Sequence, residues 1–129
     1  MAIIYPQTAH AECLVIAYVP VAVTTIYTAP EDATNDPGAT MQVVLSSIWL
    51  YNDDASSQTI SIYVVEDGQS AAAKYKRWQV VIPTKESMSL TQLGLVMPHK
   101  ATLRVGGASS GTVVSVHVSG AVLVDANAV

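Results

Sequence analysis

Hydrophobic and polar residues alternate with a period of two along most of this chain, as they do in strands with one face on a core. In QTISIYVV, Ile60, Ile62 and Val64 share one side, while Thr59 and Ser61 lie on the other. Other segments repeat the pattern, with these residues expected on the core side: Ala101, Leu103 and Val105; Val114, Val116, Val118, Val122 and Val124; and Trp78, Val80 and Ile82. No stretch keeps a helical period, and SAAAKYKRW is interpreted as a loop that leads into a strand.

Turn-forming segments rich in Gly, Pro, Asn, Asp and Ser separate these runs, namely APEDATNDPGAT, NDDASS, EDGQS and GGASSG. The alternation and the turns together predict about eight strands, near residues 12–19, 22–28, 40–52, 58–66, 76–82, 87–92, 101–106 and 112–124. Short strands at regular spacing favour an all-β fold, a single-domain antiparallel β-sandwich or jelly roll.

The stretch SIWLYNDDASSQTISIYVV predicts two paired strands joined by a turn over residues 52–57. In the first strand, regular alternation places Trp49 on the same side as Tyr51, Leu45 and Val43. The opposite side, with Ile48, Leu50 and Val44, is apolar as well. Such a strand is either central in a sandwich or covered by another chain, and the sequence leaves both readings open.

Composition favours association with other subunits. Half of the 129 residues are hydrophobic, 12% are charged, and the net charge is −4. Because buried interfaces are depleted of charged residues, we expect neighbouring subunits to cover much of the surface; the alternative is a well-packed monomer with a Ser/Thr surface. The one basic cluster, Lys74, Lys76 and Arg77, is interpreted as a solvated strand edge, so no nucleic-acid groove is expected.

The residues that could act in catalysis or bind a metal are too scattered in the sequence to predict an enzyme. His10, His99 and His117 lie far apart in the sequence, without the spacing of a zinc site, and no GxSxG, HExxH or P-loop pattern occurs. The carboxylates in EDATND, at residues 31–36, lack the EF-hand pattern, so they are interpreted as turn residues rather than a calcium site. We therefore expect no catalytic residue, no metal and no cofactor.

We divide the chain into two parts. Residues 1–22 are expected to form an N-terminal arm and the first strand, and residues 23–129 the sandwich domain. Pro6 interrupts any regular strand through Ile3, Ile4 and Tyr5, so residues 1–7 are expected to extend as an arm. Cys13 lies in an apolar run and is predicted to be a buried thiol. The segment lacks a positively charged signal-peptide start, and Pro20 breaks a run too short for a membrane span. These features favour a cytoplasmic site of synthesis and no membrane role.

Three phrases together resemble small β-sandwich structural proteins of tailed bacteriophages. They are VTTIYTAP, SSIWLYNDDASSQTISIYVV and SMSLTQLGLVMPHKATLRVGGASSGTVVSVHVSGAVL, so the resemblance runs from about residue 23 to 124. Pro98, His99 and Lys100 stand where members of this family often carry a Gly-Asp turn.

The resemblance implies a non-enzymatic virion component, assembled in the host cytoplasm. The expected function is a capsid decoration (cement) protein that stabilises the assembled head; the alternatives are a tail or head–tail junction protein and a carbohydrate- or receptor-binding module. The expected partners are further copies of the chain, with a trimer as the favoured homo-oligomer, and the major capsid protein or another virion protein. The candidate interface residues are Ile3, Ile4, Tyr5, Leu14, Ile16, Trp49, Tyr51 and Trp78. A sugar site would need exposed aromatic rings beside polar groups, for which Trp49, Trp78, Tyr51 and Tyr75 are candidates.

Overall fold

A computed structural model describes residues 12–30 and 40–125 of the chain. In these ranges the regular structure is β1 (Glu12–Tyr18), β2 (Thr24–Thr28), β3 (Thr40–Asn52), β4 (Gln58–Val65), the short 3-10 helix η1 (Ala73–Tyr75), β5 (Lys76–Ile82), β6 (Ser87–Leu90), β7 (Leu95–Met97), β8 (Thr102–Gly106) and β9 (Val114–Asp125). The arm residues Ile3, Ile4 and Tyr5, His10 and the carboxylates of residues 31–36 lie outside the described residues.

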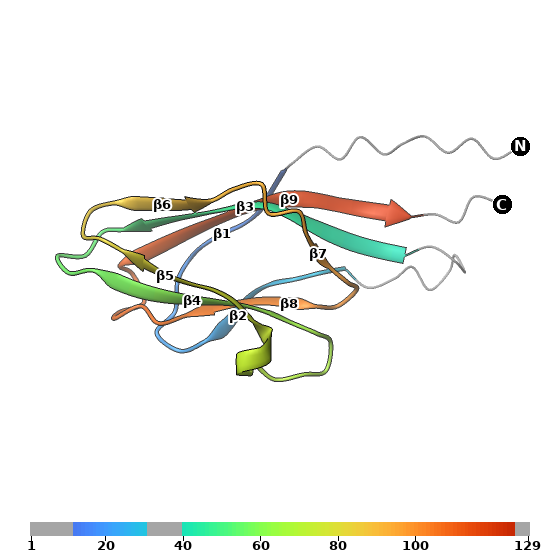
Figure 1. The fold of residues 1–129 in the computed structure, drawn as a ribbon, viewed down its shortest axis with the longest axis horizontal. Coiled ribbons are helices and arrows are strands. Elements are labelled where there is room, and N and C mark those ends of the chain that lie inside the picture. Colours follow the sequence, from blue (N-terminus) through green and yellow to red (C-terminus); the bar gives the residue numbers. More distant parts are fainter. Residues whose placement is uncertain (1–11, 31–39, 126–129) are drawn as a thin grey trace, which may run out of the picture.

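The strands form two antiparallel sheets that pack face to face (Figure 1). Sheet A has the order β1-β9-β3-β6, with β7 also paired to β3, and sheet B has the order β2-β8-β4-β5. Strands pair from the ends of the chain inward: β1 with β9, β2 with β8, β3 with β6 and β4 with β5. This nested pairing is that of a jelly roll, so the predicted all-β sandwich is confirmed. The first strand is part of sheet A.

The prediction that SIWLYN and QTISIYVV pair with each other is wrong. These segments belong to β3 and β4, which lie in different sheets, and the turn between them carries the chain across the sandwich. Asn52, which is fully buried, fixes this crossing. Its Nδ2 donates hydrogen bonds to the carbonyl oxygens of Ser56 (2.9 Å) and Ile82 (3.0 Å), and its Oδ1 accepts one from the backbone N–H of Asp54 (2.9 Å). Two strands joined by such a crossing lie in different sheets, so each one pairs with strands that are more distant in the sequence.

The segment predicted as one strand near residues 87–92 ends at Leu90, and the sequence reading missed β7 at Leu95–Met97. Both β6 and β7 pair with β3, at different positions along it. Between them Gln92 and Gly94 take positive φ angles of 55°, and the backbone N–H of Leu93 donates to the carbonyl oxygen of Ser46 (3.1 Å). One edge of sheet A is therefore a strand broken by a short loop.

A β-bulge in β3 interrupts its alternation. Leu45 pairs with Gly120, but the next paired residue on β3 is Ser47, opposite Ser119, so that Ser46 is an additional residue. The Ser46 hydroxyl donates to the carbonyl oxygen of Ser119 (3.1 Å). Before the bulge the odd-numbered residues of β3 therefore face the core, and after it the even-numbered residues do.

The bulge corrects the predicted faces of β3. Val43 and Leu45 are buried before it, and Ile48 and Leu50 are buried after it. Regular alternation predicted that Trp49 shares a side with Val43 and Leu45. That prediction is wrong, because Trp49 points outward. The core between the sheets is otherwise as expected on β4 and β8, where Ile60, Ile62, Val64, Leu103 and Val105 are buried, as is Ala101 just before β8.

The predicted burial of Cys13 is also wrong, because its side chain is exposed. Cys13 lies on β1, an edge strand of sheet A, next to a bulge between Cys13 and Val15. The hydrophobic run around it suggested a buried thiol, but Cys13 pairs with Ser119 on the outer face of sheet A, away from the core.

Candidate binding surface

Within residues 12–30 and 40–125, no group of three or more His, Cys, Asp or Glu side chains is placed to hold a metal ion. In the same part of the chain, no helix is long and apolar enough to cross a membrane. His117 is exposed on the outer face of β9. What the described residues do offer is two surfaces suited to binding.

The first surface is the outer face of sheet A, where four large side chains are exposed although they are hydrophobic. Ile16 is 68% exposed, Tyr18 57%, Trp49 51% and Tyr51 41%. We call these residues the aromatic face. Exposed hydrophobic side chains of this size that gather on one face mark binding sites more often than inert surface.

Strand register brings the aromatic face together. Directly opposed residues form two rows across four strands: Ile16, His117, Trp49 and Ser89 in the first, and Tyr18, Ser115, Tyr51 and Ser87 in the second. Opposed residues in an antiparallel sheet have their side chains on the same face, close enough to interact. Each row therefore alternates a large hydrophobic side chain with a small or polar one.

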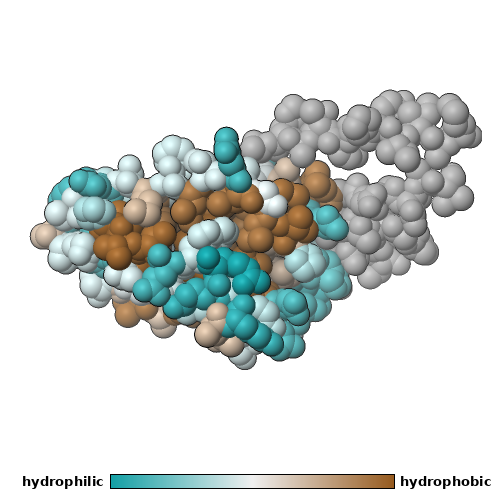
Figure 2. Space-filling model, viewed as in Figure 1, coloured by the Kyte–Doolittle hydropathy of each residue, from teal (hydrophilic) through white to brown (hydrophobic). Residues whose placement is uncertain are grey.

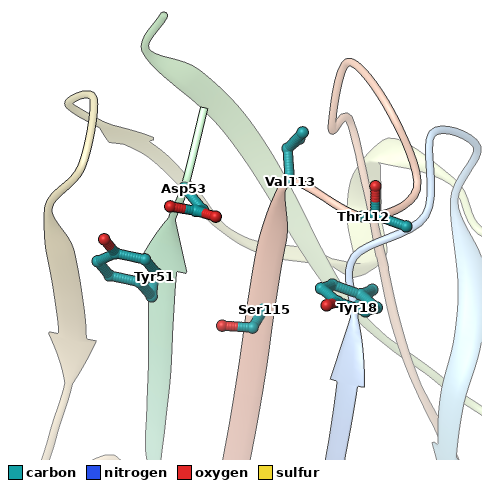
Figure 3. Close-up of a pocket in the computed structure, with 6 residues that line it drawn as sticks. All are labelled: Tyr18, Tyr51, Asp53, Thr112, Val113 and Ser115. Carbon is teal, nitrogen blue, oxygen red and sulfur yellow. The ribbon is translucent and has the colours of Figure 1, made fainter. Parts of the chain in front are cut away.

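Within the second row, between Tyr18 and Tyr51, the surface forms an open hollow of about 210 Å³. Figure 3 shows its lining residues, with the rings of Tyr18 and Tyr51 on either side of the Ser115 hydroxyl and Asp53 above it. Thr112 and Val113, which precede β9, complete the wall. Two aromatic rings, a carboxylate and two aliphatic hydroxyls thus meet in one small concavity.

The carboxylate at this hollow is already neutralised. Lys85 Nζ lies 2.9 Å from Asp53 Oδ1 and also donates to the Asp53 carbonyl oxygen (2.7 Å). The hydrogen bond to the Asp53 side chain is the main cause that raises the pKa of Lys85 above its usual value. Both side chains remain well exposed, at 60% and 66%. No other described residue donates a hydrogen bond to the Asp53 carboxylate, so Oδ2 is available to a ligand.

The second surface is the side of the sandwich where β5 ends sheet B and β6 and β7 end sheet A, the side that faces the viewer in Figure 1. We call it the open flank, defined by six partly buried side chains that pack on the core: Trp78, Val80, Met88, Leu90, Leu93 and Leu95. Figure 2 shows hydrophobic side chains gathered on this side of the molecule, with hydrophilic ones beside them. Val81 on β5 and Val96 on β7 are exposed on the outer faces of sheets B and A, next to the flank.

The candidate interface residues divide between these surfaces. Ile16, Trp49 and Tyr51 lie together on the aromatic face, Trp78 belongs to the open flank, and Leu14 is half-buried against the core. Of the four aromatic residues considered for a sugar site, Trp49 and Tyr51 are exposed beside polar groups.

The two remaining aromatic candidates do not meet that condition. Tyr75 is buried in η1, and Trp78 is partly buried. Sequence reasoning missed Tyr18, which stands two residues after Ile16 and so faces the same way along β1. The spacing from Ile16 to Tyr18 was visible in the sequence. The sequence did not show that β9 would place Tyr18 beside Tyr51.

No protein-family model matches the chain, and no curated protein or solved structure shows a significant similarity to it. The case for a function therefore depends on these surfaces and on the sequence features from which it was expected.

Proposed function

We propose that the protein is a non-enzymatic structural component of a bacteriophage virion, a decoration protein that binds the assembled capsid through its open flank. The observation that carries this proposal is the incomplete cover of the core between the edge strands β5 and β6. A partner laid on this flank would remove the partly buried apolar side chains from water, and each side chain fully buried contributes about 1.5–3 kcal/mol.

Charge supports an acidic partner surface. Lys76 and Arg77 are exposed on β5, at the border of the open flank, and Lys74 is exposed just before them. These basic residues stand out in a chain with a net charge of −4. A complementary acidic surface would favour encounter in one orientation and would make the association sensitive to salt.

Decoration would act by mass action. A subunit that binds only the assembled shell stabilises that state by an amount that grows with the concentration of free subunit. No bond is made or broken, so the proposal requires no catalytic residue. The resemblance of residues 23–124 to structural proteins of tailed bacteriophages favours this function over binding functions outside the virion.

The test is cosedimentation of the purified protein with isolated heads and isolated tails of the phage whose genome encodes it. We expect the protein to sediment with heads. Val81→Lys and Val96→Lys place charges on β5 and β7 at the borders of the open flank, where a partner that covers the flank would meet them. They should weaken binding at least tenfold without lowering the melting temperature by more than a few degrees. Thr28→Lys, an exposed position on β2, is the matched control and should bind normally.

Two results would contradict the proposal. Sedimentation with tails alone would indicate a tail or head–tail junction protein. Absence from both fractions, at concentrations where the protein is folded, would exclude a structural function in the virion.

A further inference from the structure

The aromatic face and the open flank differ in composition, and the difference indicates different ligands. Ser115 and His117 lie between the large side chains of the aromatic face, and Ser87 and Ser89 lie beside them on β6; these residues present hydroxyl and imidazole groups to solvent. The six side chains of the open flank are hydrophobic, apart from the indole N–H of Trp78. A dry protein contact suits the flank, whereas the aromatic face suits a ligand that is itself part apolar and part hydroxylated.

We propose that the hollow between Tyr18 and Tyr51 binds one ring of an uncharged saccharide. A sugar ring has apolar C–H faces, which can pack on the tyrosine rings on either side, and a rim of hydroxyl groups. The Ser115 and Thr112 hydroxyls can donate to or accept from that rim, and the Asp53 carboxylate can accept from it. Figure 3 shows Asp53 and Ser115 between the two tyrosines, with Thr112 above Tyr18.

The charge of the hollow selects against ionic ligands. Lys85 Nζ lies 2.9 Å from Asp53 Oδ1, so the paired charges offer neither a cation nor an anion an unpaired charge of opposite sign. A neutral polyol can use the free carboxylate oxygen without breaking the pair. This argues for hexoses and N-acetylated hexoses over uronic acids and amines.

The size of the hollow indicates a single ring. Its 210 Å³ is smaller than the roughly 300–1,000 Å³ that drug-sized ligands occupy. Trp49 lies two residues before Tyr51 on β3, about 7 Å along the strand, on the same face. A second ring of a longer glycan can therefore pack on Trp49, so a disaccharide is expected to bind more tightly than its monomer.

The inference is independent of the proposed attachment to a capsid, because the hollow and the open flank involve different residues. Attachment through the flank leaves the hollow free to meet a glycan.

The experiment combines a glycan array with NMR titrations of the full chain. The titration probes are methyl α-glucoside, methyl β-galactoside, N-acetylglucosamine and the corresponding disaccharides, with glucuronate as a charged ring and glycerol as an acyclic polyol. At least one neutral glycoside should shift the amide resonances of Thr112 and Ser115, with a dissociation constant of about 1 mM, typical of a small ligand that binds with about −4 kcal/mol. Glucuronate and glycerol should bind at least tenfold more weakly.

Variants locate the site. Tyr18→Ala and Tyr51→Ala should each weaken glycoside binding at least tenfold, whereas Tyr63→Ala, a half-exposed tyrosine on sheet B, should not. Ser115→Gln fills the hollow while keeping both rings, so it tests the site even if a tyrosine variant folds poorly. Trp49→Ala should weaken disaccharide binding and leave the monosaccharide unaffected.

Absence of binding across the array and titrations would overturn the inference, and so would binding that survives Tyr18→Ala, Tyr51→Ala and Ser115→Gln. Loss of capsid binding in Tyr18→Ala and Tyr51→Ala, without any glycan binding, would assign the aromatic face to a protein partner instead. Loss of capsid binding in the flank variants, with glycan binding intact, would leave the inference standing.

Discussion

Leu45 and Ile48 are both fully buried on the inner side of β3, although a spacing of three residues puts side chains on opposite faces of a regular strand. The additional residue at Ser46 accounts for this. The bulge keeps both halves of β3 in the core, and it turns Trp49 and Tyr51 toward solvent together. A binding face and a packed core are thus specified by the same irregularity.

Deleting Ser46 should therefore be tolerated. Without it, Leu45, Ser47 and Ile48 alternate regularly, so Leu45 and Ile48 both stay buried. The expected loss is two hydrogen bonds, from the Ser46 hydroxyl to Ser119 and from the Leu93 N–H to Ser46, or about 1–3 kcal/mol of unfolding free energy. Urea unfolding followed by circular dichroism measures it.

Deleting Val44 from the same strand is the matched control. Either Val43 or Leu45 must then leave the core, because no register keeps both inside. The expected loss is about 3 kcal/mol or more, the range of large core truncations. Equal losses of unfolding free energy for the two deletions would contradict our inference that Ser46 is the residue whose bulge keeps both halves of β3 in register with the core.

Gly120 is predicted to tolerate no side chain. It pairs with Leu45 next to the bulge, and a Cβ there would overlap the carbonyl oxygen of Val44 and lie 3.2 Å from the Leu45 Cα. Both atoms belong to backbone, which cannot rotate away, so Gly120→Ala should cost about 1–3 kcal/mol. Gly111→Ala is the control, because a Cβ at that position meets nothing within 4 Å. Similar melting temperatures for the two variants would show that the sheet adjusts.

Local alternation predicted the fold class because, in each strand, the hydrophobic residues are those whose side chains face the core. Ile60, Ile62 and Leu103 were placed correctly for that reason. It failed at Ser46 because a bulge changes parity without leaving a distinctive residue type. It failed for the pairing of β3 because the partner of a strand depends on closure of the whole sandwich, where residues such as Ser47 and Ser119 lie far apart in sequence.

The candidate surfaces were predictable only in part. Trp49 and Tyr51 stood out as large residues on an apolar strand, but nothing local told which of the two faces of β3 was covered. Tyr18 joins them through β9, since Ser115 pairs with Tyr18 on one side and with Tyr51 on the other. A hollow formed across three strands cannot be found from the pattern of any single one.

Asn52 should be the most sensitive polar residue at the crossing from β3 to β4. Asn52→Ala removes the donor to the buried Ile82 carbonyl oxygen, and an unsatisfied buried group costs about 1–3 kcal/mol. Asn52→Asp should be worse at pH 7, because a carboxylate would face the carbonyl oxygens of Ser56 and Ile82. Asp53→Ala, an exposed neighbour with a surface ion pair, should change stability by less than about 1 kcal/mol. A larger loss for Asp53→Ala than for Asn52→Ala would contradict this assignment.

Stability should depend on pH through Asp54. Its Oδ2 accepts hydrogen bonds from the Ser56 hydroxyl (2.8 Å) and from Gln58 Nε2 (2.8 Å), and the Ser56 bond is the largest of the causes that lower the pKa of Asp54 below its usual 3.8. A carboxyl whose pKa is lower in the folded state stabilises the fold above the unfolded-state pKa, and that contribution disappears as pH falls through the folded-state value.

Asp54→Asn should accordingly melt at a lower temperature than the native chain at pH 7, and the difference should shrink as pH falls from about 4 toward 2. Ser56→Ala removes the main cause of the lowered pKa, so in its background the pH dependence of the Asp54→Asn effect should be smaller. Thermal melts of the four chains at pH 7, 4, 3 and 2 provide the comparison. A difference that stays constant from pH 7 to pH 2 would mean that the Asp54 carboxylate contributes nothing to stability through its charge.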